Sequence, residues 1–218
     1  MEARLTQIPE REVLRYLGVR GDGDAALRDS IAKQSSLLME AATPRLVWKR
    51  LPMDAHFIEG KDLQRLLQDG KELVLFAATL GMEVERLSRQ KQLKNMAEAL
   101  VFDACADAAI EDVCDNFCHD LAREISPLCL TRRFSPGYGD LPLTYQKKMF
   151  DALDIFRRIG VSLTESGLML PQKSVTAIMG IRETPMPNRI LLCEGCSLND
   201  HCTHRREAGV CEKRDSDS

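Results

Sequence analysis

The segment 95–125 constrains the fold most strongly, because it carries one continuous apolar face. Apolar residues at positions 96, 99, 106, 110, 113, 117 and 121 fall within a single arc of a helical wheel. At 1.5 Å per residue, a helix of this length spans roughly 45 Å. We therefore expect this helix to form the backbone of a globular domain.

The flanking segments mix helices and strands without a repeating β-α-β order. The segment 1–40 is expected to be mainly helical, and spacing and breaker residues predict helices at 24–42, 62–67, 81–91 and 143–159 and strands at 45–51, 72–80, 161–163, 167–170 and 174–181. This mixture favours an α+β fold, with a mostly antiparallel twisted sheet packed against long helices. Pro185 and Pro187 mark a linker, so we expect a domain at 1–184 and a small Cys-rich tail at 185–218.

Composition narrows the class of protein. Of the 218 residues, 44% are hydrophobic, which is enough for a packed core and excludes a disordered chain. The 30 Lys and Arg nearly balance the 33 Asp and Glu, and this argues against nucleic-acid binding, which needs a basic excess. No apolar run approaches the roughly 18 residues of a membrane helix, and the N-terminus lacks the apolar region of a signal peptide. We expect a cytoplasmic protein without a membrane partner.

Eight cysteines fall into two groups. Four are scattered over 105–129, and two of them, Cys114 and Cys118, stand four residues apart in the long helix, where they are expected to pack in the core. The other four crowd the tail as C-x2-C-x5-C-x8-C and are candidate metal ligands: Cys193, Cys196, Cys202 and Cys211.

The tail pattern leaves three interpretations open. Thiolates suit both iron–sulfur clusters and zinc. A zinc ribbon normally has a second C-x2-C or an H-x3–5-H pair, so the uneven spacing favours a 4Fe–4S cluster. His201 and His204 flank Cys202 and keep a mixed-ligand zinc site possible, and a tail without metal is the third interpretation.

Two ordered motifs carry a family resemblance. Residues 133–142 fit R-x-x-P-G-Y-x-x-x-P, and residues 160–175 fit G-x-x-L-T-E-S-x-x-M-x-P-x-x-S-V. Upstream, residues 106–111 fit A-D-x-x-x-E. Together they resemble the reactivation domain of cobalamin-dependent methionine synthase, which binds S-adenosylmethionine. The resemblance covers about residues 72–182.

The resemblance implies a binding site whose chemistry fits that ligand. Arg133 offers a permanently charged fork for a carboxylate, and Tyr138 offers a ring face to a sulfonium or a base. Glu111 suits an amine, and Glu165 is expected to brace the loop. The full set of expected ligand-binding residues is Arg133, Pro136, Gly137, Tyr138, Gly139, Glu111 and Glu165. The alternative for the loop is an ordinary surface turn.

The chain also departs from the family pattern. We find no D-W-x-P-F-F segment near its start, although an acidic residue in that segment contributes to ligand binding in the family. After the second motif the chain turns into the Cys-rich tail, whereas the family domain continues with further helix and sheet.

The resemblance implies a reactivation subunit for a cobalamin-dependent methionine synthase or related corrinoid protein. Such a subunit supports reductive methylation of cob(II)alamin carried by the partner, with flavodoxin or ferredoxin as electron donor, and needs no catalytic side chain of its own. A 4Fe–4S cluster would suit one-electron transfer. The alternative is a non-catalytic scaffold or partner of a corrinoid methyltransferase, with a structural metal site in the tail. A small-molecule methyltransferase is disfavoured, because the glycine-rich loop expected after a first strand is missing.

Overall fold

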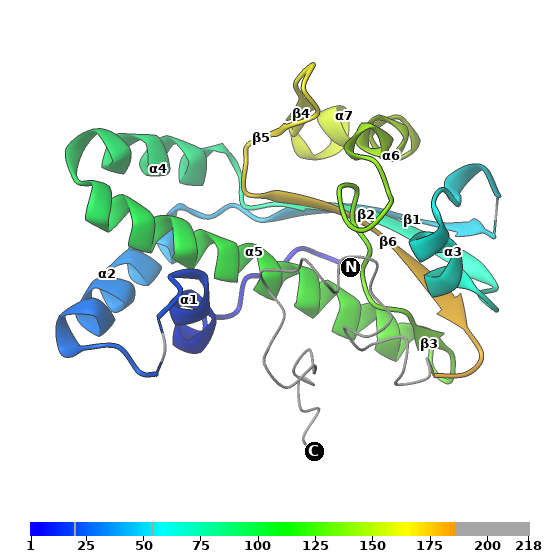
Figure 1. Ribbon diagram of the computed structural model, residues 1–218, viewed down its shortest axis with the longest axis horizontal. Coiled ribbons are helices and arrows are strands. Elements are labelled where there is room, and N and C mark those ends of the chain that lie inside the picture. The colour runs from blue at the N-terminus through cyan, green and yellow to red at the C-terminus, as the bar shows by residue number, and fades with distance from the viewer. Residues whose placement is uncertain (20, 54, 186–218) are drawn as a thin grey trace.

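A computed structural model describes residues 1–19, 21–53 and 55–185 (Figure 1). The predicted tail and its four cysteine ligands therefore lie outside the described residues. The helices are α1 (Glu10–Tyr16), α2 (Ala25–Ala41), α3 (Lys61–Leu67), α4 (Met82–Lys94), α5 (Met96–Glu124), α6 (Gln146–Leu153) and α7 (Ile155–Ile159), with short 3-10 turns at Ala55–Phe57 and Leu143–Tyr145. The strands are β1 (Arg45–Pro52), β2 (Glu72–Thr79), β3 (Cys129–Leu130), β4 (Ser162–Leu163), β5 (Met169–Leu170) and β6 (Ser174–Arg182).

The main sheet has the order β1-β2-β6-β3, and its strand pairs are antiparallel. β2 and β6 pair along their full length, with Thr79 opposite Ser174 and Glu72 opposite Ile181. On the other side of β6, β3 reaches only Ile181 and Arg182, and Phe134 adds one bridge to Ile178. In the described part of the chain, no strand therefore pairs with the outer edge of β6 along residues 174–177.

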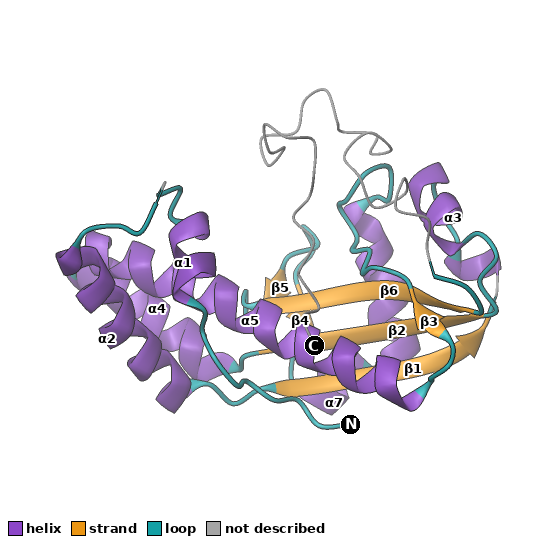
Figure 2. Cartoon of the chain, turned by 90° about the horizontal axis from the view of Figure 1, so that it is seen from below, coloured by secondary structure: helices purple, strands orange, loops and turns teal. Residues whose placement is uncertain are grey.

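Helices cover both faces of this sheet, as Figures 1 and 2 show. The alternation of side chains along β2 explains the two layers. Val74, Phe76 and Ala78 pack with α5, whose outer side is covered in turn by α1, α2 and α4. Leu73 and Leu75 face the opposite way and pack with α3, α6 and α7. This architecture confirms the predicted α+β fold with an antiparallel sheet and a long central helix. Cys114 is buried in the core as predicted, and Cys118 packs against this core half-buried.

The predicted continuous helix over 143–159 is wrong. The chain breaks at Asp154, whose φ of 51° is left-handed, and α6 and α7 follow separately. The reason is packing: Leu153 and Ile155 are both about 1% exposed in the same core. In one straight helix, residues two apart point about 200° away from each other, so both side chains reach this core only if the helix breaks.

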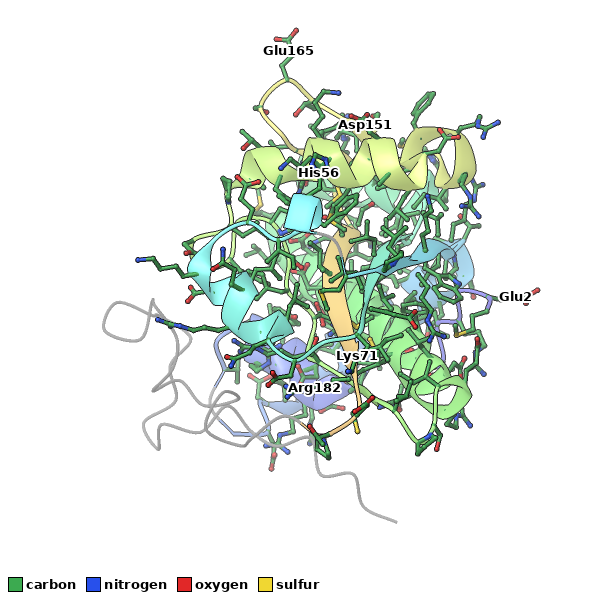
Figure 3. All side chains as sticks on the ribbon, turned by 90° about the vertical axis from the view of Figure 1, so that its right-hand side faces the viewer. Glu2, His56, Lys71, Asp151, Glu165 and Arg182 are labelled. Atoms are coloured by element: carbon green, nitrogen blue, oxygen red, sulfur yellow. The ribbon has the colours of Figure 1, made fainter. Side chains whose placement is uncertain are left out.

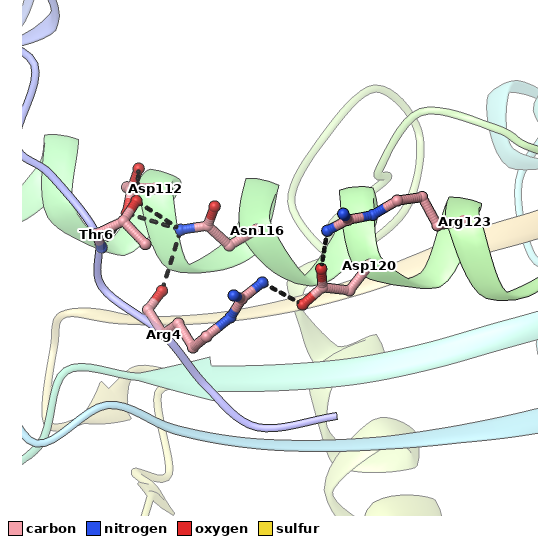
Figure 4. Close-up of polar contacts among 6 residues, drawn as sticks. All are labelled: Arg4, Thr6, Asp112, Asn116, Asp120 and Arg123. Carbon is pink, nitrogen blue, oxygen red and sulfur yellow. Dashed lines mark hydrogen bonds and ion pairs between the residues drawn. The ribbon is translucent and has the colours of Figure 1, made fainter.

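The N-terminal segment is also less helical than expected, because residues 1–9 run along α5 without helical structure. Contacts among four residues hold them there, and we call these residues the N-terminal clamp: Arg4, Thr6, Asp112 and Asn116 (Figure 4). Asp112 accepts from the Thr6 backbone N–H at 2.7 Å and from Asn116 Nδ2 at 2.9 Å. Arg4 also pairs with Asp120 at 2.5 Å.

Candidate functional site

The loop that carries the first motif crosses the edge of β6. Phe134 exchanges two backbone hydrogen bonds with Ile178, at 2.9 and 2.8 Å, and its side chain enters the core on the α6 side. The neighbouring Arg133 contacts α5 instead. The bridge at Phe134 therefore fixes Arg133 between the edge of the sheet and the long helix.

The Arg133 guanidinium meets two carboxylates. Its Nη2 lies 2.5 Å from Glu111 Oε2 and 3.0 Å from Asp115 Oδ1. Nη1 is buried and has no hydrogen-bond partner among the described residues. Because buried polar groups are nearly always paired, this nitrogen is a donor that the described part of the protein leaves open. Beside it, burial raises the pKa of Cys114 to about 12, so this thiol stays protonated.

A pocket of about 340 Å³ adjoins this arginine. Its walls come from α5, the motif loop, the start of α6, β5 and β6, and its lining residues are Glu111, Arg133, Ser135, Pro136, Tyr138, Gln146, Met169, Ser174, Val175 and Thr176. Within the described residues, five side chains carry a buried polar atom without a partner: Gln34, Arg133, Gln146, Thr176 and Arg182. Three of these five line this one pocket, which concentrates unmet hydrogen-bonding capacity there.

The motif loop is held in shape by α3. Gly137 and Gly139 have φ values of 91° and 53°, and a Cβ on Gly139 would approach Asp62 Oδ2 to 2.3 Å. Asp140 caps α3 from outside, since its carboxylate accepts the backbone N–H groups of Lys61 at 2.6 Å and Asp62 at 3.1 Å. Partial desolvation raises the pKa of Asp140, but these two donors outweigh it and lower the pKa below its usual value.

A row of acidic residues runs along α5 beside the pocket, four residues apart: Asp103, Asp107, Glu111 and Asp115. Lys173 lies 2.9 Å from Asp103 and 2.7 Å from Asp107, whereas Arg133 pairs with the other two. Burial raises the pKa of Asp107, and the charge of Lys173 opposes this effect. In the part of the chain that the structure describes, these ion pairs join four carboxylates to two cations, so this wall of the site is rich in acidic groups.

The structure brings most of the predicted binding residues together. Glu111, Arg133, Pro136 and Tyr138 line the pocket, with 61% of Tyr138 exposed at its rim. Gly137 and Gly139 belong to the same loop and shape its turn without lining the pocket.

Glu165 lies elsewhere. It stands at the tip of the β4–β5 hairpin and points away from the body of the protein (Figure 3). There it lines a separate hollow of about 490 Å³ with Leu143, Lys147 and Ser166. The structure does not bring Glu165 to the arginine pocket, and its part in ligand binding stays a prediction.

Sequence reasoning missed four residues of the site: Asp115, Asp140, Gln146 and Thr176. Asp115 could have been found from the sequence, because it continues the four-residue spacing of the acidic residues that precede it on α5. The other three become visible only through contacts with distant segments.

Two negative findings apply to the described residues. They contain no group of three or more His, Cys, Asp or Glu side chains that could hold a metal ion. None of their helices has both the length and the apolar character that crossing a bilayer requires.

Comparisons with known proteins agree with the fold and the motifs. One solved structure that resembles this chain is described as "Crystal Structure of the MetH Reactivation Domain bound to AdoHcy"; the match has a TM-score of 0.58 and 16% sequence identity, and it covers 81% of this chain and 76% of that chain. A search of curated proteins found no match. The model of the family "Vitamin B12 dependent methionine synthase, activation domain" matches residues 57–186. Because this match spans more than half of the sequence, the chain belongs to the activation-domain family of vitamin B12-dependent methionine synthases.

Proposed function

We propose that this chain binds S-adenosylmethionine (AdoMet) and serves as the reactivation subunit of a cobalamin-carrying methionine synthase or related corrinoid protein. The observation that carries the proposal is the pocket beside Arg133, where three buried polar atoms lack partners among the described residues. Membership in the activation-domain family supports the choice of ligand, and so does the solved MetH domain, which holds AdoHcy, the demethylated form of AdoMet.

The amino-acid end of AdoMet matches the charged side of the pocket. A carboxylate on Arg133 Nη1 would satisfy the buried donor that has no described partner, through a charge-assisted hydrogen bond. Glu111 lies on the other nitrogen of the same guanidinium, 2.5 Å away, and would pair with the ligand's amine. One arginine and one glutamate thus present opposite charges to the two charges of an α-amino acid.

The acidic row on α5 suits the sulfonium. AdoMet carries a positive sulfur that AdoHcy lacks, and Coulomb attraction to nearby carboxylates favours the charged form. Among the described residues, Asp103, Asp107, Glu111 and Asp115 form ion pairs with Lys173 and Arg133, and an added positive charge beside four carboxylates is favourable.

The open edge of β6 supplies backbone groups. In an antiparallel ladder, alternate residues turn their N–H and C=O groups outward. Ile178 bonds outward to Phe134, so Thr176, two residues earlier, also turns its backbone groups outward. Thr176 lines the pocket, and its backbone can therefore hydrogen-bond a bound ligand.

The described residues fit a positioning role in the reaction. When docked, the partner's corrinoid supplies the methyl-accepting cobalt, and an electron donor such as flavodoxin or ferredoxin supplies one electron. This chain would hold AdoMet at the pocket mouth, with its sulfonium methyl turned outward, and exclude water from around it. The proposed transfer needs no general acid or base from this chain.

Calorimetry with AdoMet tests the binding step. We expect the wild-type chain to bind and Arg133→Met to lose about 100-fold in affinity, the upper range for a hydrogen bond to a charged group. Arg132→Met is the matched control, because Arg132 is the exposed neighbour and does not line the pocket. Circular dichroism of each variant checks folding. A well-folded wild-type chain that binds neither AdoMet nor AdoHcy would favour the alternative, a scaffold for a corrinoid methyltransferase.

Reconstitution tests the partner. A cob(II)alamin-loaded methionine synthase lacking its own activation domain, a one-electron reductant, AdoMet and this chain should together restore the methylated corrinoid spectrum. Omitting this chain, or replacing it by Arg133→Met, should leave the cob(II)alamin spectrum. Restoration without this chain would contradict the proposal.

The tail at 185–218 remains a proposed metal-binding appendage. Anaerobic purification should give brown protein with iron and sulfide for a 4Fe–4S cluster held by Cys193, Cys196, Cys202 and Cys211. Colourless protein with zinc would favour the structural site, and protein without either metal would remove both.

A further inference from the structure

The pocket has a second polar end, on the α6 side of the sheet. Gln146 is the first residue of α6 and only 6% exposed, and Thr176 on β6 is 2% exposed. Gln146 Oε1 and Thr176 Oγ1 are both buried without a hydrogen-bond partner among the described residues. Both side chains line the same pocket as Arg133.

These two groups lie on the opposite side of β6 from the charged end. Ile178 packs in the core on the α6 side, and Thr176 shares its parity along the strand. Ala177 and Met179 pack in the core on the α5 side instead. The pocket therefore bends around the uncovered edge of β6, from Arg133 and Glu111 on one face to Gln146 and Thr176 on the other.

The two ends offer different chemistry. The α5 end holds ionised groups, which suit an amino acid. The α6 end offers a carbonyl acceptor and a hydroxyl, both neutral, which suit a group with one donor and one acceptor side by side. The Watson–Crick edge of adenine has that pair, with an exocyclic amino donor next to a ring-nitrogen acceptor, and a side-chain amide oxygen is a suitable acceptor for this amino group.

We infer that Gln146 and Thr176 hydrogen-bond the adenine of the bound nucleoside and make the site selective for adenine over other purines. Gln146 Oε1 accepts a hydrogen bond from the exocyclic amino group, and the Thr176 hydroxyl donates to the adjacent ring nitrogen. This inference rests on the proposed function, since it assigns the far end of the same ligand.

An analogue pair tests the inference. S-inosylhomocysteine differs from AdoHcy in carrying a carbonyl where adenine has its amino group, and a ring N–H where adenine has an acceptor. A site built to hydrogen-bond one pattern rejects the other, because its buried groups stay unpaired. We expect calorimetry to show that the wild-type chain prefers AdoHcy by about 10-fold or more.

Three variants test which side chains cause the preference for AdoHcy over S-inosylhomocysteine. Gln146→Leu and Thr176→Val should each bring the two affinities within about 3-fold of each other, because an apolar side chain cannot discriminate the patterns. Gln146→Glu keeps an acceptor at the same position and should keep the preference for AdoHcy. Arg133→Met is the matched control: it should weaken both ligands alike and leave their ratio unchanged, because Arg133 contacts the amino-acid end.

Thermal unfolding without ligand separates recognition from a structural role. Since Gln146 Oε1 and Thr176 Oγ1 have no described partner to lose, Gln146→Leu and Thr176→Val should not lower Tm. Equal wild-type affinities, or an unchanged preference in Gln146→Leu, would overturn the inference and leave the proposed function standing. Folded wild-type protein that binds neither analogue would instead overturn the proposed function.

Discussion

The N-terminal clamp and the arginine pocket are built on consecutive residues of α5, yet they differ in how completely their polar groups are paired. Asp112 is 8% exposed and accepts from the Thr6 backbone, the Thr6 hydroxyl and Asn116. Arg133, which Glu111 holds, keeps one buried nitrogen without a described partner. A charged and largely buried side chain is thus common to the two places, and the proposed binding site differs in that its buried polar atom without a described partner lies beside a pocket.

The largest effect should come from breaking the clamp. Asp112→Ala removes the acceptor of the Thr6 N–H and of the Thr6 hydroxyl and one of the acceptors of the Asn116 amide, and we expect the free energy of unfolding to fall by about 3 kcal/mol. Urea denaturation measures this loss. AdoMet affinity at a temperature where the variant is folded should stay within about 2-fold of wild type, because the clamp serves the fold. A large loss of affinity in folded protein would show that the clamp belongs to the site.

Glu111→Gln tests the arginine pocket, the second of the two regions compared. Removing its charge should weaken AdoMet binding about 10-fold and AdoHcy binding less, because only AdoMet carries the sulfonium. Calorimetry with both ligands measures the difference. Asp112→Asn, one residue along, is the control and should not change the AdoMet to AdoHcy ratio. Equal losses for both ligands would place Glu111 at the amine alone.

Asp140→Asn should cost about 1 kcal/mol of stability at pH 7, the typical value of a helix cap. The folded-state pKa of Asp140 lies below its unfolded value of 3.8, so its contribution is present above that value and declines as the pH falls through the folded-state pKa. Denaturation of both proteins between pH 7 and pH 2.5 should show the difference shrinking at the acid end. A difference that does not depend on pH would mean that the ionised carboxylate is not the cap.

The smallest effect should come from Glu165→Gln. The side chain stands on the hairpin tip, so AdoMet affinity should change by less than about 2-fold, as for most exposed charges. A larger loss of AdoMet affinity in calorimetry would show that Glu165 contributes to ligand binding and that the binding site extends to the hairpin.

Local patterns predicted the parts of the fold that depend on one segment. The apolar period over 95–125 predicted α5 within about a residue at each end, and the apolar run 72–80 predicted β2. The break at Asp154 was not predictable in this way, because it follows from two buried side chains that compete for one core. β3 is only two residues long and exists through its pairing with β6.

The candidate site likewise contains residues that a local motif predicted and residues that only the packing of distant segments reveals. A motif in contiguous sequence pointed to Arg133, Pro136 and Tyr138, and all three line the pocket. Gln146 and Thr176 carry no local signal, since a glutamine at a helix start and a threonine in a strand are ordinary. What points to them is burial without a partner among the described residues, and burial depends on how α6 and β6 pack together.

The uncovered stretch of β6 has a consequence for self-association. An unpaired strand edge invites pairing with another copy of the chain and can seed aggregation. Here the uncovered stretch is short. The Phe134 bridge to Ile178 ends it on one side. On the other side it is preceded by Pro171, which has no backbone N–H, and by Lys173, which carries a charge. Along this stretch, β6 can therefore present backbone groups to a small molecule while offering only a few residues with which a strand of a second chain could pair.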